Sequence, residues 1–348
     1  MPWYSFLLAP FALIFRVITE IRNALYNWDV LKSEKGKIPS IVVGNLSVGG
    51  TGKTPMVEFL LRNLSTQMKL AVLSRGYGRK TKGFMIAKME SKPSQIGDEP
   101  HQIFHKFVGN IPVFVSENRV EGIAKIYELI PELDAVVLDD AFQHRSLKAD
   151  FFILLTPYQK PFSQDFILPM GRLRESRKGG KRADLVVVTK SPQNLSFKGK
   201  SALIQELRPY LIPNTPILFS SIKYGEPLAL EHAERFTENV ILISGLADDR
   251  LFVDFCQSKF NVLDVMSFPD HHEYSQEDFL AFLAKASSQK SSNPVFLCTE
   301  KDGEKLKSLG KGGFLGEIPI FVLPIEVKFN PEEKEILLTH IRKKLVSK

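Results

Sequence analysis

Residues 40–55 read SIVVGNLSVGGTGKTP, a short apolar run that leads into a loop rich in glycine. Between residues 56 and 64, apolar side chains recur at the spacing of an amphipathic helix. A strand on one side and a helix on the other are the context that a phosphate-binding P-loop requires. The stretch therefore predicts a P-loop that joins a buried strand to a helix.

Two residues depart from the usual G-x-x-x-x-G-K-[ST] pattern of such loops. Ser47 stands where the first glycine is expected, but Gly49, Gly50 and Gly52 still supply the backbone freedom that lets N–H groups converge on phosphate oxygens. Pro55 falls in the first helical turn, where an N–H has no acceptor within the helix, so the helix loses nothing. The proline does remove one donor to a nucleotide.

The loop predicts a binding site for a nucleotide and Mg²⁺. Lys53 is expected to place its cation on the β- and γ-phosphates, and Thr54 to offer a hydroxyl ligand to the metal. The alternative is a glycine-rich turn that merely precedes an ordinary helix. The residues expected to contact the nucleotide are Ser47, Val48, Gly49, Gly50, Thr51, Gly52, Lys53 and Thr54.

Length and composition indicate a globular protein of two domains. The 348 residues leave room for two domains of ordinary size, and a hydrophobic content of 44% is sufficient for packed cores. A net charge of +7 suggests an anionic partner, which could be a nucleotide, a phospholipid headgroup or nucleic acid. Cys256 and Cys298 are too few and too far apart in sequence for a disulfide framework or a zinc cluster, so a reducing cytoplasm is inferred.

The N-terminal segment MPWYSFLLAPFALIF carries no charged side chain. It lacks the basic start and the small-residue cleavage site of a secretory signal. It is also shorter than the roughly 20 residues needed to span a bilayer, and Pro10 interrupts it. We therefore expect a helix that lies in the membrane interface, with a core-buried first helix as the alternative. The expected anchors are Trp3, Tyr4 and Trp28, with Arg16 and Arg22 facing lipid phosphates.

Apolar runs then alternate with helical patterns, which is typical of a mostly parallel sheet with helices on both faces. The expected fold is α/β and P-loop NTPase-like, with a second, smaller α/β domain. A stretch rich in proline separates the two. We expect a membrane-associated helix over 1–28, a P-loop domain over 29–212, an extended linker over 213–236 and the second domain over 237–348. The apolar runs are 41–43, 70–73, 113–115, 135–138, 151–155, 185–188, 216–219, 240–243, 262–265, 295–297 and 320–323.

In an open α/β sheet, functional side chains collect in the loops at the carboxyl ends of the strands. The run 135–138 leads directly into Asp139 and Asp140, where a Walker B acid must lie to reach Mg²⁺ held by Thr54. Other loops carry SRGYGRK, GDEP and ENR. Each motif alone is as easily a solvated surface, a turn or a helix cap. Together they predict a site for phosphoryl transfer, in which positioning and charge neutralisation do most of the catalysis.

The segments NLSVGGTGKTP, SRGYGR, GDEP, ENR, LDDAFQHRSLKAD, GRLRES, PDHHEY and TEKD occur in this order. In these the chain closely resembles the tetraacyldisaccharide 4'-kinase family, the lipid A 4'-kinases of Gram-negative bacteria. The resemblance covers most of the chain and includes a hydroxyl residue at Ser47. Ala141 stands where glycine is usual and Ser176 where proline is common. The resemblance therefore does not predict the local shape of these two loops.

The resemblance implies a kinase that uses ATP and Mg²⁺ to phosphorylate the 4'-hydroxyl of a tetraacyldisaccharide 1-phosphate. It implies an enzyme bound peripherally or monotopically to the inner membrane at its cytoplasmic face. The implied partners are the acylated disaccharide phosphate and the membrane surface, with no nucleic acid. Neither the residues nor the resemblance predicts an oligomeric state.

The resemblance also implies roles for individual residues. Asp98 becomes the base for the attacking hydroxyl and His271 its partner from the second domain, with Lys53 and Arg119 completing the catalytic set. From the residues alone, the favoured interpretation of PDHHEY is a helix start in which His271 has no catalytic part. The implied metal ligands are Thr54, Asp139, Asp140 and Glu175, and the implied substrate-binding residues are Arg75, Tyr77, Asn118, Gln143, His144 and Arg172.

A membrane-associated P-loop ATPase or GTPase switch is the alternative function. It shares the loop, the acidic pair and the basic surface, but it needs no base poised for an alcohol. A soluble small-molecule kinase of the same fold is a third possibility, against which the N-terminal segment argues.

Overall fold

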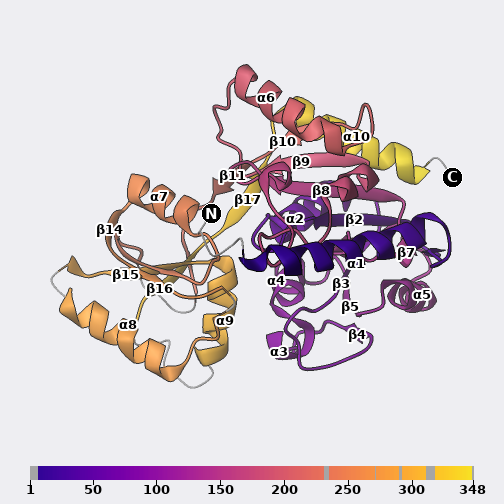
Figure 1. The fold of residues 1–348 in the computed structure, drawn as a ribbon. Coiled ribbons are helices and arrows are strands. Elements are labelled where there is room, and N and C mark those ends of the chain that lie inside the picture. Colours follow the sequence, from indigo (N-terminus) through magenta and orange to yellow (C-terminus); the bar gives the residue numbers. More distant parts are fainter. Residues whose placement is uncertain (1–6, 231–234, 271, 290–291, 311–317, 347–348) are drawn as a thin grey trace. The chain divides into compact units, whose positions relative to one another are not determined.

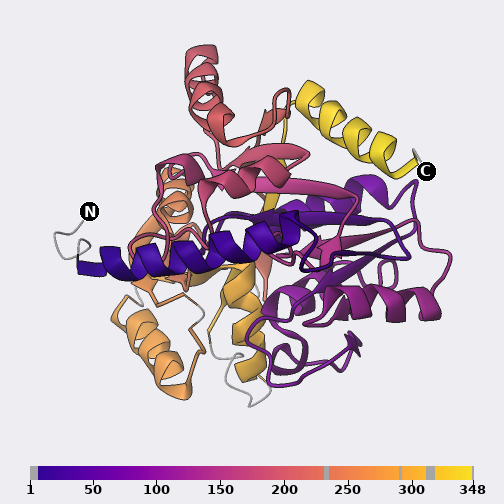
Figure 2. The same ribbon diagram turned by 45° about the vertical axis from the view of Figure 1, so that its right-hand side comes forward.

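The computed structural model describes the chain except for residues 1–6, 231–234, 271, 290–291, 311–317 and 347–348. Its residues form two compact units: the first comprises the chain up to residue 222 and again from residue 327, and the second comprises residues 223–326 (Figures 1 and 2). The chain leaves the first unit within β11 (Ser221–Tyr224) and returns within β17 (Ile325–Lys328). These two strands pair with each other.

In the described part of the first unit, eight strands form one sheet, which is parallel except for β4 at one edge. β2, the strand before the glycine-rich loop, lies in the interior between β8 and β6. Every apolar run predicted in this part of the chain is a strand of this sheet. The order is β10 (Ile217–Phe219), β9 (Leu185–Thr189), β8 (Phe151–Pro157), β2 (Ser40–Asn45), β6 (Ala135–Asp139), β3 (Leu70–Ser74), β5 (Val113–Val115) and β4 (Met85–Ile86).

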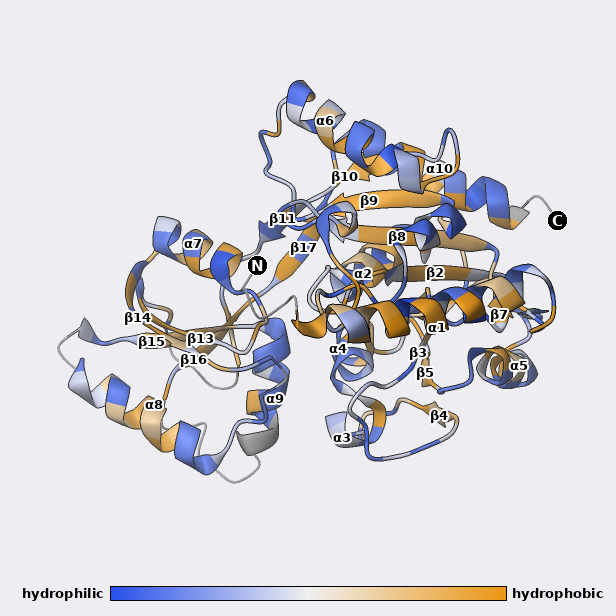
Figure 3. Ribbon diagram, viewed as in Figure 1, coloured by the Kyte–Doolittle hydropathy of each residue, from blue (hydrophilic) through white to orange (hydrophobic). Residues whose placement is uncertain are grey.

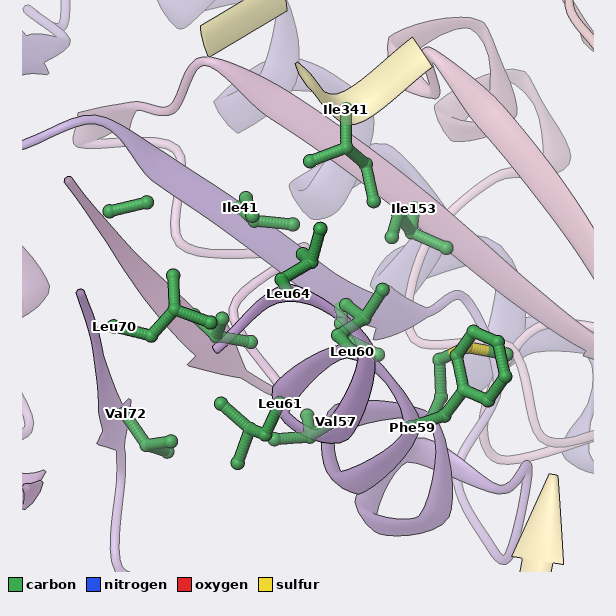
Figure 4. Close-up of a cluster of buried hydrophobic side chains, with 14 of the residues drawn as sticks. Ile41, Val57, Phe59, Leu60, Leu61, Leu64, Leu70, Val72, Ile153 and Ile341 are labelled. Atoms are coloured by element: carbon green, nitrogen blue, oxygen red, sulfur yellow. The ribbon is translucent and has the colours of Figure 1, made fainter. Parts of the chain in front are cut away.

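Helices cover both faces of this sheet, because its strands are apolar on both sides. Ile41 and Val43 of β2 belong to one core and Val42 to the other, as the alternation of side chains along a strand requires. Figure 4 shows Leu60 and Leu64 of α2 in the same cluster as Ile41. The first face carries α2 (Lys53–Leu64), α4 (Asp98–Lys106) and α10 (Pro331–Val346), and the second carries α5 (Arg119–Leu129) and α6 (Phe197–Leu207).

The C-terminal helix α10 belongs to the first unit, whereas the sequence placed it in a second domain over 237–348. Leu337, Leu338 and Ile341 are buried in the same core as α2. Figure 4 shows Ile341 in this cluster. The expected linker over 213–236 also differs, because β10 lies within it and pairs with β9 of the large sheet. An amphipathic pattern predicts that a helix buries one face, but it does not say against which sheet.

The second unit is built on a separate sheet, parallel except for β12. Its two faces again carry two cores: Phe279 and Phe282 of α8 pack on one, and Phe252 and Cys256 of α7 on the other. The strand order is β12 (Leu228–Ala229), β16 (Ile320–Leu323), β15 (Val295–Thr299), β13 (Asn239–Ser244) and β14 (Asn261–Ser267), and the helices are α7 (Arg250–Lys259), α8 (Gln276–Ser288) and α9 (Glu300–Gly310). The prediction of a mixed α/β fold with mostly parallel sheets is confirmed.

The N-terminal helix α1 (Ala9–Asn27) lies along the outside of the first unit in both views (Figures 1 and 2). Within the helix only Ala12 is buried, and Phe11, Ile14 and Ile18 are each more than half exposed, at 62%, 57% and 59%. Figure 3 shows the many hydrophobic positions along α1. Two of its expected anchors, Trp3 and Tyr4, lie outside the described residues.

In the described part of the chain, no helix combines the length and apolar character that crossing a bilayer requires. The remaining short elements of the first unit are β1 (Glu34–Lys35), which pairs with β7 (Leu147–Lys148), α3 (Pro93–Ile96), and 3₁₀ turns at Phe162–Gln164, Arg177–Arg182 and Arg208–Tyr210.

Candidate active site

The glycine-rich loop connects β2 to α2, as the sequence predicts. Gly49 and Gly52 have φ angles of 100° and 83°, in the left-handed region that favours glycine. Gly52 is the residue before α2, and Lys53 and Thr54 begin the helix. The first N–H groups of a helix have no partner within it, so they and the positive end of the helix dipole suit a phosphate group.

Two side chains hold the loop in shape from the ends of strands. Asn45, at the end of β2, donates from Nδ2 to Oγ1 of Thr51 at 2.6 Å. Thr189, at the end of β9, donates from its hydroxyl to the carbonyl oxygen of Thr51 at 2.8 Å. The side chain of Thr51 is therefore buried as part of the loop's support, and its expected contact with nucleotide remains a prediction.

A second segment, GRLRES, runs beside the start of the loop. The N–H of Val48 donates to the carbonyl of Arg172 at 2.8 Å, and the N–H of Arg174 donates to the carbonyl of Leu46 at 2.7 Å. Ser47, between them, is 3% exposed and bridges to Leu173. The position that departs from the glycine pattern is thus a buried bridge residue.

Asp140 is the centre of charge beside the loop. Arg174 donates to both of its carboxylate oxygens at 2.7 and 3.1 Å, and Nζ of Lys53 lies 3.8 Å from Oδ1. Burial alone would raise the pKa of Asp140, but Lys53 and Arg174 lower it below its usual value. Arg174 also contacts Oδ1 of Asn45, so a single guanidinium connects the acidic pair to the strand before the loop.

Asp139, the last residue of β6, is 4% exposed. Burial raises the pKa of this carboxyl to about 7, and the negative charges of Asp140 and Glu99 act in the same direction against Lys53 and Arg119. Its Oδ1 is a buried oxygen with no hydrogen-bond partner among the described residues. A buried oxygen without a donor is costly, so the position is suited to a cation.

Arg119 is almost fully buried, at 2% exposed, and lies at the start of α5. Its guanidinium donates to the carbonyl oxygens of Ser116 and Glu117 at 2.9 and 3.1 Å. A longer contact of 3.5 Å reaches the carbonyl of Asp140. Burial lowers the pKa of Arg119 to about 10. These contacts give Arg119 a supporting position behind the acidic pair.

His144 packs against the start of α5 and is neutral. Its Nε2 lies 3.3 Å from the N–H of Arg119 and 3.0 Å from the hydroxyl of Ser146. Burial, together with the charges of Arg119, Arg22 and Arg75, lowers the pKa of His144 to about 4. An uncharged imidazole can accept the main-chain hydrogen bond at this place.

The loops SRGYGR and GDEP meet through two glycines. A Cβ on Gly97 would stand 2.9 Å from the Cα of Gly76, and a Cβ on Gly76 would stand 2.7 Å from the carbonyl oxygen of Ile96. Only glycine permits this approach of one main chain to another. It brings Asp98, the first residue of α4, beside the loop that carries Arg75.

Gln143 and Glu175 form a polar network that contacts the end of β2. Nε2 of Gln143 donates to the carbonyl of Asn45 at 2.7 Å and to Oε1 of Glu175 at 3.0 Å. Arg182 donates to both oxygens of Glu175 at 2.7 and 2.9 Å, and Asn23 of α1 donates to Oε2 at 2.9 Å. Protein donors thus already occupy both oxygens of Glu175, which was expected to bind metal.

The other expected substrate residues are distributed as follows. Arg172 is half-buried and pairs with Asp165 at 2.7 Å. Asn118 caps α5, its Oδ1 accepting from the N–H groups of Val120 and Glu121. Arg75 and Tyr77 are exposed on their loop. His271 lies outside the described residues.

Several residues at this site were assigned no role from the sequence. Arg174 is the main partner of Asp140, and Asn45 and Thr189 support the loop. Glu99 lies close enough to affect Asp139. Arg174 and Glu99 are neighbours of predicted residues in GRLRES and GDEP. This proximity in the sequence could have identified them as site residues. Asn45 and Thr189 end two strands of the sheet, the place where functional side chains collect.

No three acidic, histidine or cysteine side chains in the described residues are grouped as a metal site. Asp139 and Asp140 nevertheless lie at the carboxyl end of β6, next to the loop and Lys53. Fold and site together define a mixed α/β protein suited to a phosphate-bearing ligand at the carboxyl edge of a parallel sheet.

The chain belongs to the tetraacyldisaccharide-1-P 4'-kinase family, whose family model matches residues 4–342. It is 40% identical to a tetraacyldisaccharide 4'-kinase of Flavobacterium psychrophilum over 94% of this chain and 93% of that protein. A protein of the same name from Bacteroides fragilis is 37% identical over 92% of this chain and 88% of its own. The crystal structure of LpxK from Aquifex aeolicus in complex with ATP is similar, with 31% identity, a TM-score of 0.73, and coverage of 98% of this chain and 99% of that chain.

Proposed function

We propose that this chain is a kinase that transfers the γ-phosphate of ATP to the 4'-hydroxyl of a tetraacyldisaccharide 1-phosphate, a lipid A precursor. Family membership supports the reaction, and the similar LpxK of Aquifex aeolicus was crystallised in complex with ATP. The structural observation that carries the proposal is the cluster of Lys53, Asp139 and Asp140 beside the glycine-rich loop.

Mg²⁺ fits at Asp139, with the hydroxyl of Thr54 and with Asp140 as further ligands. The fit depends on Oδ1 of Asp139, a buried oxygen that lacks a donor among the described residues. Burial holds the pKa of this carboxyl near 7, and a divalent cation would favour its ionised form. When bound, Mg²⁺ neutralises charge on the β- and γ-phosphates. Glu175 is left out of this set because each of its oxygens already accepts from two donors, whereas Arg174 supplies one donor to each oxygen of Asp140 and leaves room for a metal ion.

The residues of the loop bind and orient the phosphates through main-chain N–H groups. Lys53, which lies 3.8 Å from Asp140, is proposed to contact a phosphate oxygen when nucleotide is bound. Asp98 is proposed to accept the proton of the 4'-hydroxyl while the oxygen of that hydroxyl bonds to the γ-phosphorus. The bond from that phosphorus to the bridging oxygen breaks, and ADP leaves.

The substrate is proposed to reach this site from a membrane surface. The exposed apolar side chains Phe11, Ile14 and Ile18 give α1 a face that suits the lipid interface, at the cytoplasmic side of the inner membrane. Arg75 and Tyr77 are exposed beside Asp98 and are proposed to contact the disaccharide phosphate.

The test is transfer of labelled phosphate from ATP to the acylated disaccharide phosphate by the purified full chain. We expect transfer by the parent enzyme and none by Lys53→Ala, because no other residue of the loop places a cation on the phosphates. Lys344→Ala is the matched control: it removes a lysine that pairs with Asp184 on the surface, and it should transfer at the parent rate.

The same assay separates the kinase from the ATPase or GTPase switch. Hydrolysis of nucleotide at a rate indifferent to the lipid, without labelled lipid product, would favour the switch. Family membership favours the kinase.

A further inference from the structure

Two successive residues of α1 reach the same residue of the site, Gln143. Nη2 of Arg22 donates to the carbonyl oxygen of Gln143 at 3.1 Å. Asn23 donates to Oε2 of Glu175 at 2.9 Å, and Oε1 of the same carboxylate accepts from Nε2 of Gln143 at 3.0 Å. Helix α1 therefore contacts the main chain of Gln143 directly and its side chain through Glu175. Gln143 follows Asp140 by three positions in the sequence.

From Gln143 the hydrogen bonds continue to the glycine-rich loop. Nε2 of Gln143 also donates to the carbonyl of Asn45, at 2.7 Å, and Asn45 donates to Thr51 at 2.6 Å. The result is an unbroken series of hydrogen bonds from α1 to the loop. Each bond joins two different segments of the fold, so the series fixes these segments relative to one another.

Glu175 is the rigid member of this series. It is 3% exposed, and Arg182 donates to both of its oxygens. Gly179 packs so closely that a Cβ there would stand 2.9 Å from Oε2. A carboxylate fixed in this way can orient the amide of Gln143, as supporting side chains do around functional sites.

A second contact of α1 involves both Asn27 and Asn23. Arg145 donates to Oδ1 of Asn27, one turn further along the helix, at 2.8 Å, and to Oδ1 of Asn23 at 3.4 Å. Both asparagines thus attach α1 through Arg145, and of the two Asn23 is the one that also donates to Glu175. The chain therefore offers a matched pair of α1 residues.

We infer that Asn23 and Glu175 are positioning residues for phosphoryl transfer, acting through Gln143 to align the end of β2 and the glycine-rich loop with α1. The inference rests on the proposed function and deepens it. The helix proposed to contact the lipid surface is the helix that completes the support of the phosphate-binding loop. Neither residue needs to touch ATP or the lipid.

The experiment compares Asn23→Ala with Asn27→Ala in the full chain. Asn23→Ala should lower kcat about tenfold, the order expected for loss of a hydrogen bond to a charged group, with KM for both substrates and binding to lipid vesicles within about twofold of the parent. Asn27→Ala should keep kcat within about twofold. In a Gln143→Ala background, Asn23→Ala should cause no further loss, because the two residues act in series.

A second measurement does not depend on activity. Hydrogen–deuterium exchange of the segment 45–51 should speed up several-fold in Asn23→Ala and stay at the parent rate in Asn27→Ala. Equal effects of the two variants in both measurements would mean that α1 is only attached there, and would overturn the inference. So would losses in kcat that multiply in the double variant. Failure of the proposed function has a different signature: the parent itself transfers no phosphate, while the exchange data still decide the positioning role.

Discussion

Arg174 donates to both carboxylate oxygens of Asp140, at N–O distances of 2.7 and 3.1 Å. The main-chain N–H of Arg174 also donates to Leu46 in the glycine-rich loop. One residue thus fixes the acidic pair and the loop relative to each other, and it leaves Lys53 at 3.8 Å from the same carboxylate. The geometry of the site depends on this pair.

Replacement of Arg174 should therefore impair catalysis more than folding. In Arg174→Ala, Asp140 loses the guanidinium that holds both of its oxygens, so its charge draws Lys53 away from the phosphates. We expect kcat/KM to fall by about 10- to 100-fold, which corresponds to roughly 1.4 to 2.8 kcal/mol of transition-state stabilisation. Steady-state kinetics of phosphate transfer is the measurement.

The control for that variant is Arg250→Ala. It removes a similar two-bond pair with Asp248, on the surface of the second unit. Exposed pairs contribute little, so its kinetics and stability should match the parent. Parent-like turnover by Arg174→Ala would show that the pair with Asp140 is dispensable.

Pro55 offers a test of the loop as a nucleotide site. It lies in the first turn of α2 and has no N–H to donate, so Pro55→Ala adds a donor without breaking a helical hydrogen bond. We expect tighter binding of ATP, by at most roughly 1.5 to 3 kcal/mol, the contribution of one hydrogen bond to a charged group. Titration calorimetry measures this directly. Unchanged or weaker binding would count against a phosphate at that position.

The outward face of α1 should determine binding to lipid. Phe11→Ser combined with Ile18→Ser removes two side chains that are 62% and 59% exposed. At roughly 1.5 to 3 kcal/mol for each fully buried apolar side chain, vesicle partitioning should fall by about 100-fold or more. Co-sedimentation with anionic vesicles is the measurement, and ATP binding should be retained.

Leu280→Ser is the matched control for α1, because this leucine is also exposed, at 63%, but lies on α8. It should leave vesicle binding unchanged. An equal loss in both proteins would indicate that general surface hydrophobicity, and not α1, drives the association.

His144 should make the first unit sensitive to acid. Its folded-state pKa of about 4 lies below the ordinary value of 6.5, so the unfolded chain binds a proton first as pH falls. The stability that depends on neutral His144 is fully present above pH 6.5 and is lost as pH falls toward 4. At pH 5 the loss should be roughly 1 to 2 kcal/mol.

The measurement is urea unfolding at about pH 7.5 and about pH 5 for the parent and for His144→Gln. Glutamine keeps a hydrogen-bond acceptor for the N–H of Arg119 but has no proton to gain. The parent should lose more stability than the variant between the two pH values. Identical pH dependence would mean that His144 is not the group responsible.

Much of the fold was predictable because local spacing of apolar residues determines where strands and helices form. Every predicted apolar run is a strand, from β2 to β16, since a strand buried on both faces must be apolar throughout. The glycine-rich loop and the acidic pair were also placed correctly at strand ends. For such features the spacing of a few neighbouring residues is sufficient, because secondary structure has a fixed period.

The assignment of α10 could not be predicted from its pattern. Its buried residues Leu337 and Ile341 would suit either sheet, and the chain returns to the first unit only after the whole of residues 223–326. The partner of a hydrophobic face is chosen by the shape of the whole core, which no local spacing records.

The sequence by itself determined which residue types the site has: a lysine, an acidic pair, several arginines and a set of glycines. The tertiary structure decided their partners. Arg174, and not Arg172, pairs with Asp140, while Glu175 faces Arg182 and Asn23. The physical reason is that a charged side chain takes the partner that the packed main chain brings within about 3 Å, and those partners lie up to 152 residues away.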